Sequence, residues 1–313
     1  MQSRGRWSLA TVMLAISGWA YLSIPPGTAP EVISKPSAAA NRGPIDAGDQ
    51  VTLVHRTDTA RASGKEREWE TQFYRAGSNY FEFITRAAQA AYQGDAAAQY
   101  YIGRTLARCE ETNALYPDAD SAEEAMSQLA YSPALLELER REYLNCGRFR
   151  NESPFKGLPD RPGGYLADYW QSRAVGSGYP AAVVAAASES PGKYTPQVIA
   201  TALATGNTEA MLLYGWKQAT AGDALESAPI LAAAWVLAAC RSGANCGPTN
   251  DVLPLSTCSA GIELGCSERY TVVDELTANL GSQDLERANL FAENIQASLQ
   301  YRDPGQLLKY LPF

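Results

Sequence analysis

The chain has 313 residues, of which 46% are hydrophobic and 19% are charged, a balance typical of a folded globular protein. Frequent alanine, with glycine and proline scattered along the chain, favours a mainly helical fold of one or two domains. A net charge of −8 and a pI near 4.9 argue against the basic surface that binds nucleic acid, so no nucleic-acid partner is expected.

The first predicted element is an export signal in residues 1–29. The basic start MQSRGR precedes an uncharged apolar run from Trp7 to Ile24, and Gly27 and Ala29 follow near a candidate cleavage point. The run is also long enough to span a bilayer, so an uncleaved inner-membrane anchor is the alternative. We expect an exported protein of the periplasm or cell envelope that meets a membrane only through this segment.

Residues 30–65 are predicted to form a flexible tether, because proline, glycine and other small residues recur there. The one strand-like piece is Val51–His55, and His55 is interpreted as an exposed loop residue. From residue 66 to residue 313 the apolar residues follow helical spacing, so this range is the predicted folded domain. Within it, Ser121 and Glu124 form a candidate capping box.

A closing amphipathic helix is predicted before Asp303-Pro304. One face of this helix carries apolar residues at helical spacing, namely Leu285, Ala288, Ala292, Ile295 and Leu299.

Small residues recur at matched offsets along the predicted domain. The segments GDAAAQYYIG and GNTEAMLLYG share a glycine, an alanine and a second glycine, which are Gly94, Ala98, Gly103 and Gly206, Ala210, Gly215. An alanine also stands four residues before each leading glycine, as Ala90 and Gly94, Ala174 and Gly178, Ala202 and Gly206, and Ala239 and Gly243. Trp170 and Trp235 precede two of these alanines by four residues. The pattern is that of an internal repeat.

The spacing has a physical explanation in paired helices. Steps of four place tryptophan, alanine and glycine on one face of a first helix, which the glycine ends in a left-handed conformation. The second helix returns antiparallel, with alanine at its first core position and glycine where two backbones come close. Neither helix buries its apolar face alone, so we expect the pairs to stack. In the fourth unit Gly247-Pro248 leaves no recognisable second helix.

These segments resemble Sel1-like repeats, the α/α relatives of tetratricopeptide repeats, and AACRSGANC resembles the exported, disulfide-containing branch of that family. The resemblance implies an all-α fold, a right-handed α/α superhelix of degenerate Sel1/TPR-like helical hairpins braced by disulfides. The leading glycines are unequally spaced, which departs from the regular family period.

Six cysteines behind an export signal are expected to pair in disulfides. The simplest partition joins Cys109 to Cys146 and leaves two bridges within a C-terminal group, Cys240, Cys246, Cys258 and Cys266. Zinc is the competing interpretation of that group, but its spacing lacks the close cysteine pairs of structural zinc sites. We expect no metal and no other cofactor.

No catalytic constellation stands out. The single histidine lies in the tether, which argues against Ser-His-Asp and Cys-His chemistry. Ser-x-x-Lys occurs at Ser153–Lys156 and Ser190–Lys193, but in loops rich in proline and glycine and without the companion motifs of penicillin-binding enzymes. We therefore name no catalytic residue.

Two groups of acidic residues are further candidates for function. Glu137, Glu139 and Glu142 alternate with arginines, a pattern typical of an exposed helix face with ion pairs, although paired carboxylates also hydrolyse glycans. Asp118 and Asp120 begin like a calcium loop but lack its glycine and its closing glutamate, so they are interpreted as a helix start.

The predicted function is binding. Most aromatic residues of the repeats are expected in the core, and any that line a groove would be contact anchors for a partner. These residues are Tyr92, Tyr100, Tyr101, Tyr169, Trp170, Tyr214 and Trp216. The apolar tail Gly305–Phe313 should dock on the last helices or be offered to a partner. We predict an exported scaffold for a protein, peptide or cell-wall fragment. The alternatives are an inner-membrane-tethered assembly factor and an envelope hydrolase for peptidoglycan or β-lactams, since relatives of the resembled branch are associated with β-lactam binding.

Overall fold

A computed structural model describes most of the predicted folded domain. The described residues are 64–75, 79–128, 133–156, 167–190, 192–220, 228–247, 273–274 and 280–311. The predicted signal or anchor, His55, Cys258 and Cys266 lie outside them. Residue contacts divide the chain into the units Met1–Thr52 and Leu53–Phe313, and every described residue belongs to the second unit.

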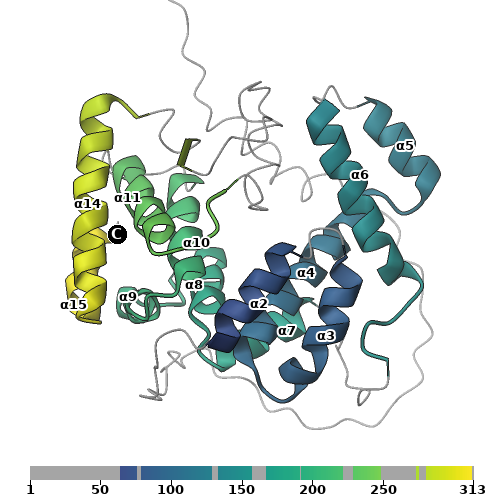
Figure 1. The fold of residues 1–313 in the computed structure, drawn as a ribbon, viewed down its shortest axis with the longest axis horizontal. Coiled ribbons are helices and arrows are strands. Elements are labelled where there is room, and N and C mark those ends of the chain that lie inside the picture. The colour runs from purple at the N-terminus through teal and green to yellow at the C-terminus, as the bar shows by residue number, and fades with distance from the viewer. Residues whose placement is uncertain are drawn as a thin grey trace, which may run out of the picture. The chain divides into compact units, whose positions relative to one another are not determined.

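The secondary structure of the described residues is helical, without a β-strand (Figure 1). The longer helices are α2 (Gly64–Arg75), α3 (Tyr80–Tyr92), α4 (Ala96–Leu115), α5 (Ala119–Gln128), α6 (Pro133–Gly147), α7 (Ala167–Gly176), α8 (Pro180–Glu189), α9 (Pro196–Ala204), α10 (Thr208–Thr220), α11 (Ala228–Arg241) and α14 (Ser282–Gln300). The short elements η2 (Arg148–Arg150), α15 (Pro304–Leu307) and η4 (Leu308–Tyr310) complete them. The all-α class expected from the sequence is therefore correct.

The helices follow the predicted pairs. The chain turns at Gly94 from α3 into α4, at Gly178 from α7 into α8, and at Gly206 from α9 into α10. Helix α11 ends before Gly243 and packs along α14, the closing helix. Neighbouring pairs also touch, because α4 packs against α7, α8 against α10, and α10 against α11.

An insertion explains part of the unequal spacing of the leading glycines. Helices α5 and α6 and the turn η2 stand between the first pair and the second, and α6 packs against α3 and α4. The inserted helices add residues between Gly94 and Gly178 without interrupting the contact between α4 and α7.

One continuous apolar core joins the pairs, and the two repeat tryptophans, Trp170 and Trp235, are fully buried in it. The closing helix buries Ala288, Ala292 and Ile295, as its spacing predicts. Among the described helices, none combines the length and the apolar character needed to cross a membrane.

Helix α5 begins one turn earlier than the sequence predicts. The capping residue is Asp118, whose carboxylate accepts from the backbone N–H of Ser121 at 2.7 Å, while the Ser121 hydroxyl accepts from the N–H of Asp118 at 3.2 Å. The hydrogen bond from the backbone N–H of Ser121 to its carboxylate lowers the pKa of Asp118, and hydrogen bonding by the Ser121 side chain adds to the shift. Ser121 and Glu124 therefore do not form the capping box, because an aspartate three residues upstream takes that place.

Candidate functional site

The four leading glycines all adopt the left-handed conformation that the repeat pattern predicts. Their φ angles are 99° at Gly94, 73° at Gly178, 75° at Gly206 and 98° at Gly243. The glycine has no Cβ, so it takes this conformation at the lowest cost. No other residue type would end the first helix at these positions without strain.

In three of the four units, the alanine that stands four residues before the glycine closes the same turn. The carbonyl of Ala90 accepts from the N–H of Asp95 at 3.0 Å, and the carbonyl of Ala174 accepts from the N–H of Tyr179 at 2.9 Å. The corresponding bond joins Ala239 and Ala244. These are Schellman turns, in which the residue after the left-handed glycine satisfies a carbonyl one turn inside the helix.

The residue after the glycine caps the second helix in two of the units. The side chain of Asp95 accepts from the N–H of Ala98 at 3.0 Å, and Asn207 accepts from the N–H of Ala210 at 2.7 Å. Both alanines are fully buried. Sequence reasoning recognised the alanines and missed the caps, although aspartate and asparagine directly before a helix are a known capping signal.

The second glycine of each matched unit lies against the first helix of the following pair, at equivalent places. A Cβ on Gly103 would lie 3.0 Å from the N of Gln171 and 3.2 Å from the O of Ala167 in α7. A Cβ on Gly215 would lie 3.0 Å from the N of Val236 and 2.8 Å from the O of Ala232 in α11.

These two pairs of neighbours occupy the same places around the repeat tryptophans. Ala167 and Gln171 flank Trp170 as Ala232 and Val236 flank Trp235. The close contact is made with the first helix of the following unit, so these glycines set the distance between consecutive pairs.

The remaining repeat residues lie in the core. Ala202 is 5% exposed and Ala174 and Ala239 are fully buried, whereas Ala90 is half-buried. Of the repeat aromatic residues, Tyr100, Tyr101, Trp170 and Tyr214 are buried, whereas Tyr92, Tyr169 and Trp216 are half-buried.

A buried ion pair between distant repeat helices was not predicted. Glu209 of α10 is 1% exposed and pairs with Arg104 of α4, whose guanidinium also lies 5.2 Å from the centre of the Phe73 ring in α2. A buried carboxylate is stable only with such a partner. The only signal in the sequence is the presence of charged residues within otherwise apolar segments, and the spacing gives no partner for either residue.

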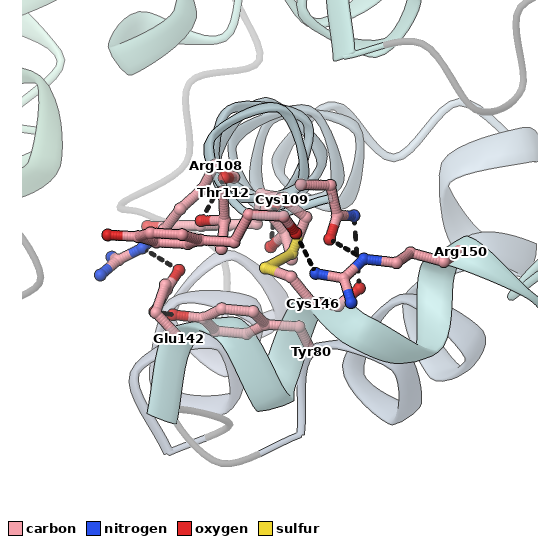
Figure 2. The surroundings of a disulfide bond; sticks show 11 residues. Tyr80, Arg108, Cys109, Thr112, Glu142, Cys146 and Arg150 are labelled. Atoms are coloured by element: carbon pink, nitrogen blue, oxygen red, sulfur yellow. Dashed lines mark hydrogen bonds and ion pairs between the residues drawn. A yellow bond between two sulfur atoms is a disulfide. The ribbon is translucent and has the colours of Figure 1, made fainter. Parts of the chain in front are cut away.

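The disulfide Cys109–Cys146 fastens the inserted helix α6 to α4 (Figure 2). It is the pairing that the sequence partition favours, and both cysteines are buried. Beside it Arg150 donates to Asn113 at 2.8 Å and to the carbonyl of Tyr116 at 2.7 Å, which adds polar contacts between η2 and α4.

Glu142 lies between α3 and α4 rather than in solvent. Tyr80 donates to it at 3.1 Å and Arg108 forms an ion pair with it, as Figure 2 shows. Glu139, one turn away, accepts from Tyr116 at 3.3 Å. Burial raises the pKa of Glu139, and the nearby charge of Glu142 adds to the shift, while the hydrogen bond from Tyr116 opposes it.

The predicted exposed acidic face of α6 is thus correct only for Glu137 and wrong for Glu139 and Glu142. Helix α6 turns these two glutamates toward tyrosines and an arginine of neighbouring helices, which the sequence of α6 alone does not reveal. Glu139 and Glu142 stand three residues apart, one helical turn along α6. Here both are held by tyrosine hydroxyls, so their evident role is to orient α6 on α3 and α4.

The C-terminal end carries the second described disulfide and the docked tail. Cys240 pairs with Cys246, across the end of α11. The tail docks on the last helices, one of the two expected placements, and the indole N–H of Trp235 donates to the carbonyl of Tyr310 at 2.9 Å. Leu307 is fully buried there.

Comparisons of the chain with known protein families, with curated proteins and with solved structures found no match.

Proposed function

We propose that the protein is an exported helical-repeat scaffold that binds a protein, peptide or cell-wall fragment in the bacterial envelope. In this proposal the helix pairs are degenerate Sel1-like hairpins that stack in a right-handed superhelix. The observation that carries the proposal is the equivalent placement of Gly103 and Gly215 against the following helices. A contact that repeats in the same register is what stacked hairpins require.

Two further observations support stacking and export. The ion pair of Arg104 with Glu209 joins the second helix of one pair to the second helix of another. The disulfide Cys109–Cys146 is of a kind that persists in oxidising compartments and is rare in the cytosol. An acidic chain with helix pairs and disulfides is suited to presenting a surface, and surfaces of stacked repeats serve as binding faces.

Localisation of the full-length protein tests the first half of the proposal. We expect it in the periplasmic or inner-membrane fraction, with Cys109 and Cys146 protected from thiol reagents until a reductant is added. A cytoplasmic protein with reactive thiols would contradict export.

Site-specific photo-crosslinking tests the second half. Leu144, Leu290 and Tyr301 are large apolar side chains that are 72%, 55% and 80% exposed. A photoreactive residue at one of them should yield an adduct of discrete mass in living cells, and the same residue at the exposed polar position Gln283 is the matched control. The absence of adducts at all three apolar positions would contradict a binding scaffold.

A further inference from the structure

The C-terminal segment, residues 304–311, is a short irregular piece of chain seated on the repeat helices. It consists of one turn of α15, one turn of η4 and the extended residue Leu311. Both turns pack against α9, and α15 lies at the end of α14 beside α9 in Figure 1. With only one helical turn each, these elements gain little stability from their own hydrogen bonds, so side-chain anchors hold the segment in place.

Three buried side chains anchor the segment in the way that apolar side chains anchor a bound peptide. Leu307 is fully buried, and Tyr310 and Leu311 are 8% and 5% exposed. The Tyr310 ring lies 6.1 Å from that of Phe291 in α14. Three large side chains spaced along a short segment are inserted between helices, as in peptide recognition by apolar anchors.

The main chain of the segment is recognised as well. The indole N–H of the buried Trp235 donates to the backbone carbonyl of Tyr310 at 2.9 Å. A bond to a carbonyl is available to any peptide that presents its backbone at this point, whatever its side chains are. We define the acceptor surface as α9 together with Trp235 and Phe291.

A strained turn connects the segment to the rest of the chain. Among the described residues, Arg302 is the only residue other than glycine with a positive φ, at 49°, and it lies between α14 and the segment. Asp303 then caps the first turn of α15, because its carboxylate accepts from the N–H of Gly305 at 2.9 Å. A left-handed conformation is costly for a residue with a Cβ, and such strain gathers at elements that switch.

We propose that the acceptor surface is a peptide-binding site that the C-terminal segment occupies in cis. The partner is a peptide or protein segment of the same chemistry, with a leucine, then a tyrosine and a leucine three and four residues later, and a free backbone carbonyl at the tyrosine. The segment competes with this partner because its covalent link to α14 keeps it at a high local concentration. The inference rests on the proposed scaffold function and names the kind of ligand and where it binds.

Binding of a labelled peptide with the sequence of residues 304–311, PGQLLKYL, tests the proposal. In the full chain, Leu307→Ala removes the deepest anchor and should raise the affinity for the peptide at least tenfold over the unchanged chain, as measured by fluorescence anisotropy. A control peptide with alanine in place of the leucine and tyrosine that match Leu307 and Tyr310 should not bind. Equal affinity for both peptides, or no gain in the Leu307→Ala chain, would overturn the proposal.

A second variant and a second readout keep the test decisive if Leu307→Ala unfolds the chain. In the unchanged protein at high concentration of unlabelled peptide, the backbone NMR signals of Leu307 and Tyr310 should move to the positions of an unfolded chain as the segment leaves, and Leu311→Ala, which removes a smaller anchor, should raise the affinity for the peptide. Signals of Leu307 and Tyr310 that stay in place would overturn the proposal. Dimerisation of the unchanged chain that Leu307→Ala abolishes, measured by light scattering, would also overturn it, because the occupant would then be the tail of a second copy.

The crosslinking and peptide-binding experiments distinguish failure of the scaffold function from failure of this inference. If the crosslinked adducts at Leu144 and Leu290 persist while the peptide does not bind, the scaffold stands and the acceptor surface is wrong. If adducts are absent and the peptide binds at Trp235, the acceptor surface stands without the scaffold.

Discussion

Gly215→Ala tests the close contact between helices α10 and α11. The added methyl would lie 2.7 Å from Cγ2 of Val236, 2.8 Å from the carbonyl oxygen of Ala232 and 3.0 Å from the N of Val236, where ordinary contact begins near 3.4 Å. Two of these three atoms belong to the backbone of α11, so a side-chain rotation does not relieve the overlap. Helices α10 and α11 must move apart.

The size of the effect follows from two opposing contributions. Alanine inside a helix is favoured over glycine by about 0.5–1 kcal/mol. Overpacking a close helix contact costs about 1–3 kcal/mol. We therefore expect Gly215→Ala to lower the free energy of unfolding by about 1–2 kcal/mol, measured from urea unfolding curves followed by circular dichroism, with an unchanged slope.

Gly176→Ala is the matched control. Gly176 ends α7, and a Cβ there would meet no atom within 4 Å. This variant should be as stable as the unchanged protein, or slightly more stable. If Gly215→Ala proves as stable as Gly176→Ala, the close approach of α10 to α11 is refuted. At Gly103 the nearest atom is Cγ of Gln171, at 2.8 Å, which belongs to a flexible side chain. Gly103→Ala should therefore cost less than Gly215→Ala, while Gly103→Leu should cost about 1–3 kcal/mol.

Three further predictions concern the polar and disulfide contacts. Arg104→Met leaves Glu209 buried without its cation and should cost about 3–5 kcal/mol in urea unfolding, whereas the double variant with Glu209→Leu should recover most of that loss. Replacing both Cys109 and Cys146 by alanine should cost about 4 kcal/mol by the chain-entropy argument, because the bridge spans 37 residues, and the loss should equal that caused by reduction if Cys240–Cys246 contributes little. Since its pKa is raised in the folded state, Glu139 favours folding in acid and loses this contribution as the pH rises through the folded pKa. Glu139→Gln should thus be more stable than the unchanged protein at pH 7, by less than about 1 kcal/mol for a partly exposed group, and equally stable near pH 4.

Each of these three has a result that would contradict it. A double variant at Arg104 and Glu209 no more stable than Arg104→Met alone would show that the cost lies in lost packing rather than in the loss of the cation beside Glu209. Unchanged melting after removal of the Cys109–Cys146 bridge would mean that α6 is held by its polar contacts alone. A stability difference for Glu139→Gln that does not vary with pH would show that charge at Glu139 is not the cause.

The turns of this fold could be predicted because they depend on residues close together in the sequence. The Schellman turn at Gly94 needs only a residue that tolerates a left-handed backbone and a carbonyl one turn earlier, at Ala90. The caps at Asp95 and Asn207 are equally local. The capping box predicted at Ser121 is wrong because Asp118 accepts from the Ser121 N–H and starts the helix one turn earlier.

The orientation of α6 could not be predicted in the same way. Its glutamates and arginines alternate, and both an exposed face and a face turned to a neighbouring helix are compatible with that pattern. The choice depends on Tyr80 and Arg108, which lie in other helices and give Glu142 its partners. The Arg104–Glu209 pair is the extreme case, since 105 residues separate its members.

The sequence by itself determined that the described domain consists of paired helices, where the pairs bend, and which small residues allow close approach, because backbone conformation and capping are decided within a few residues. The tertiary structure alone decided which charges are buried together, which face of α6 is covered, and that the C-terminal segment rests on Trp235. These features depend on the packing of helices far apart in the chain, and a buried charge or a docked tail is stable only when its distant partner is in place.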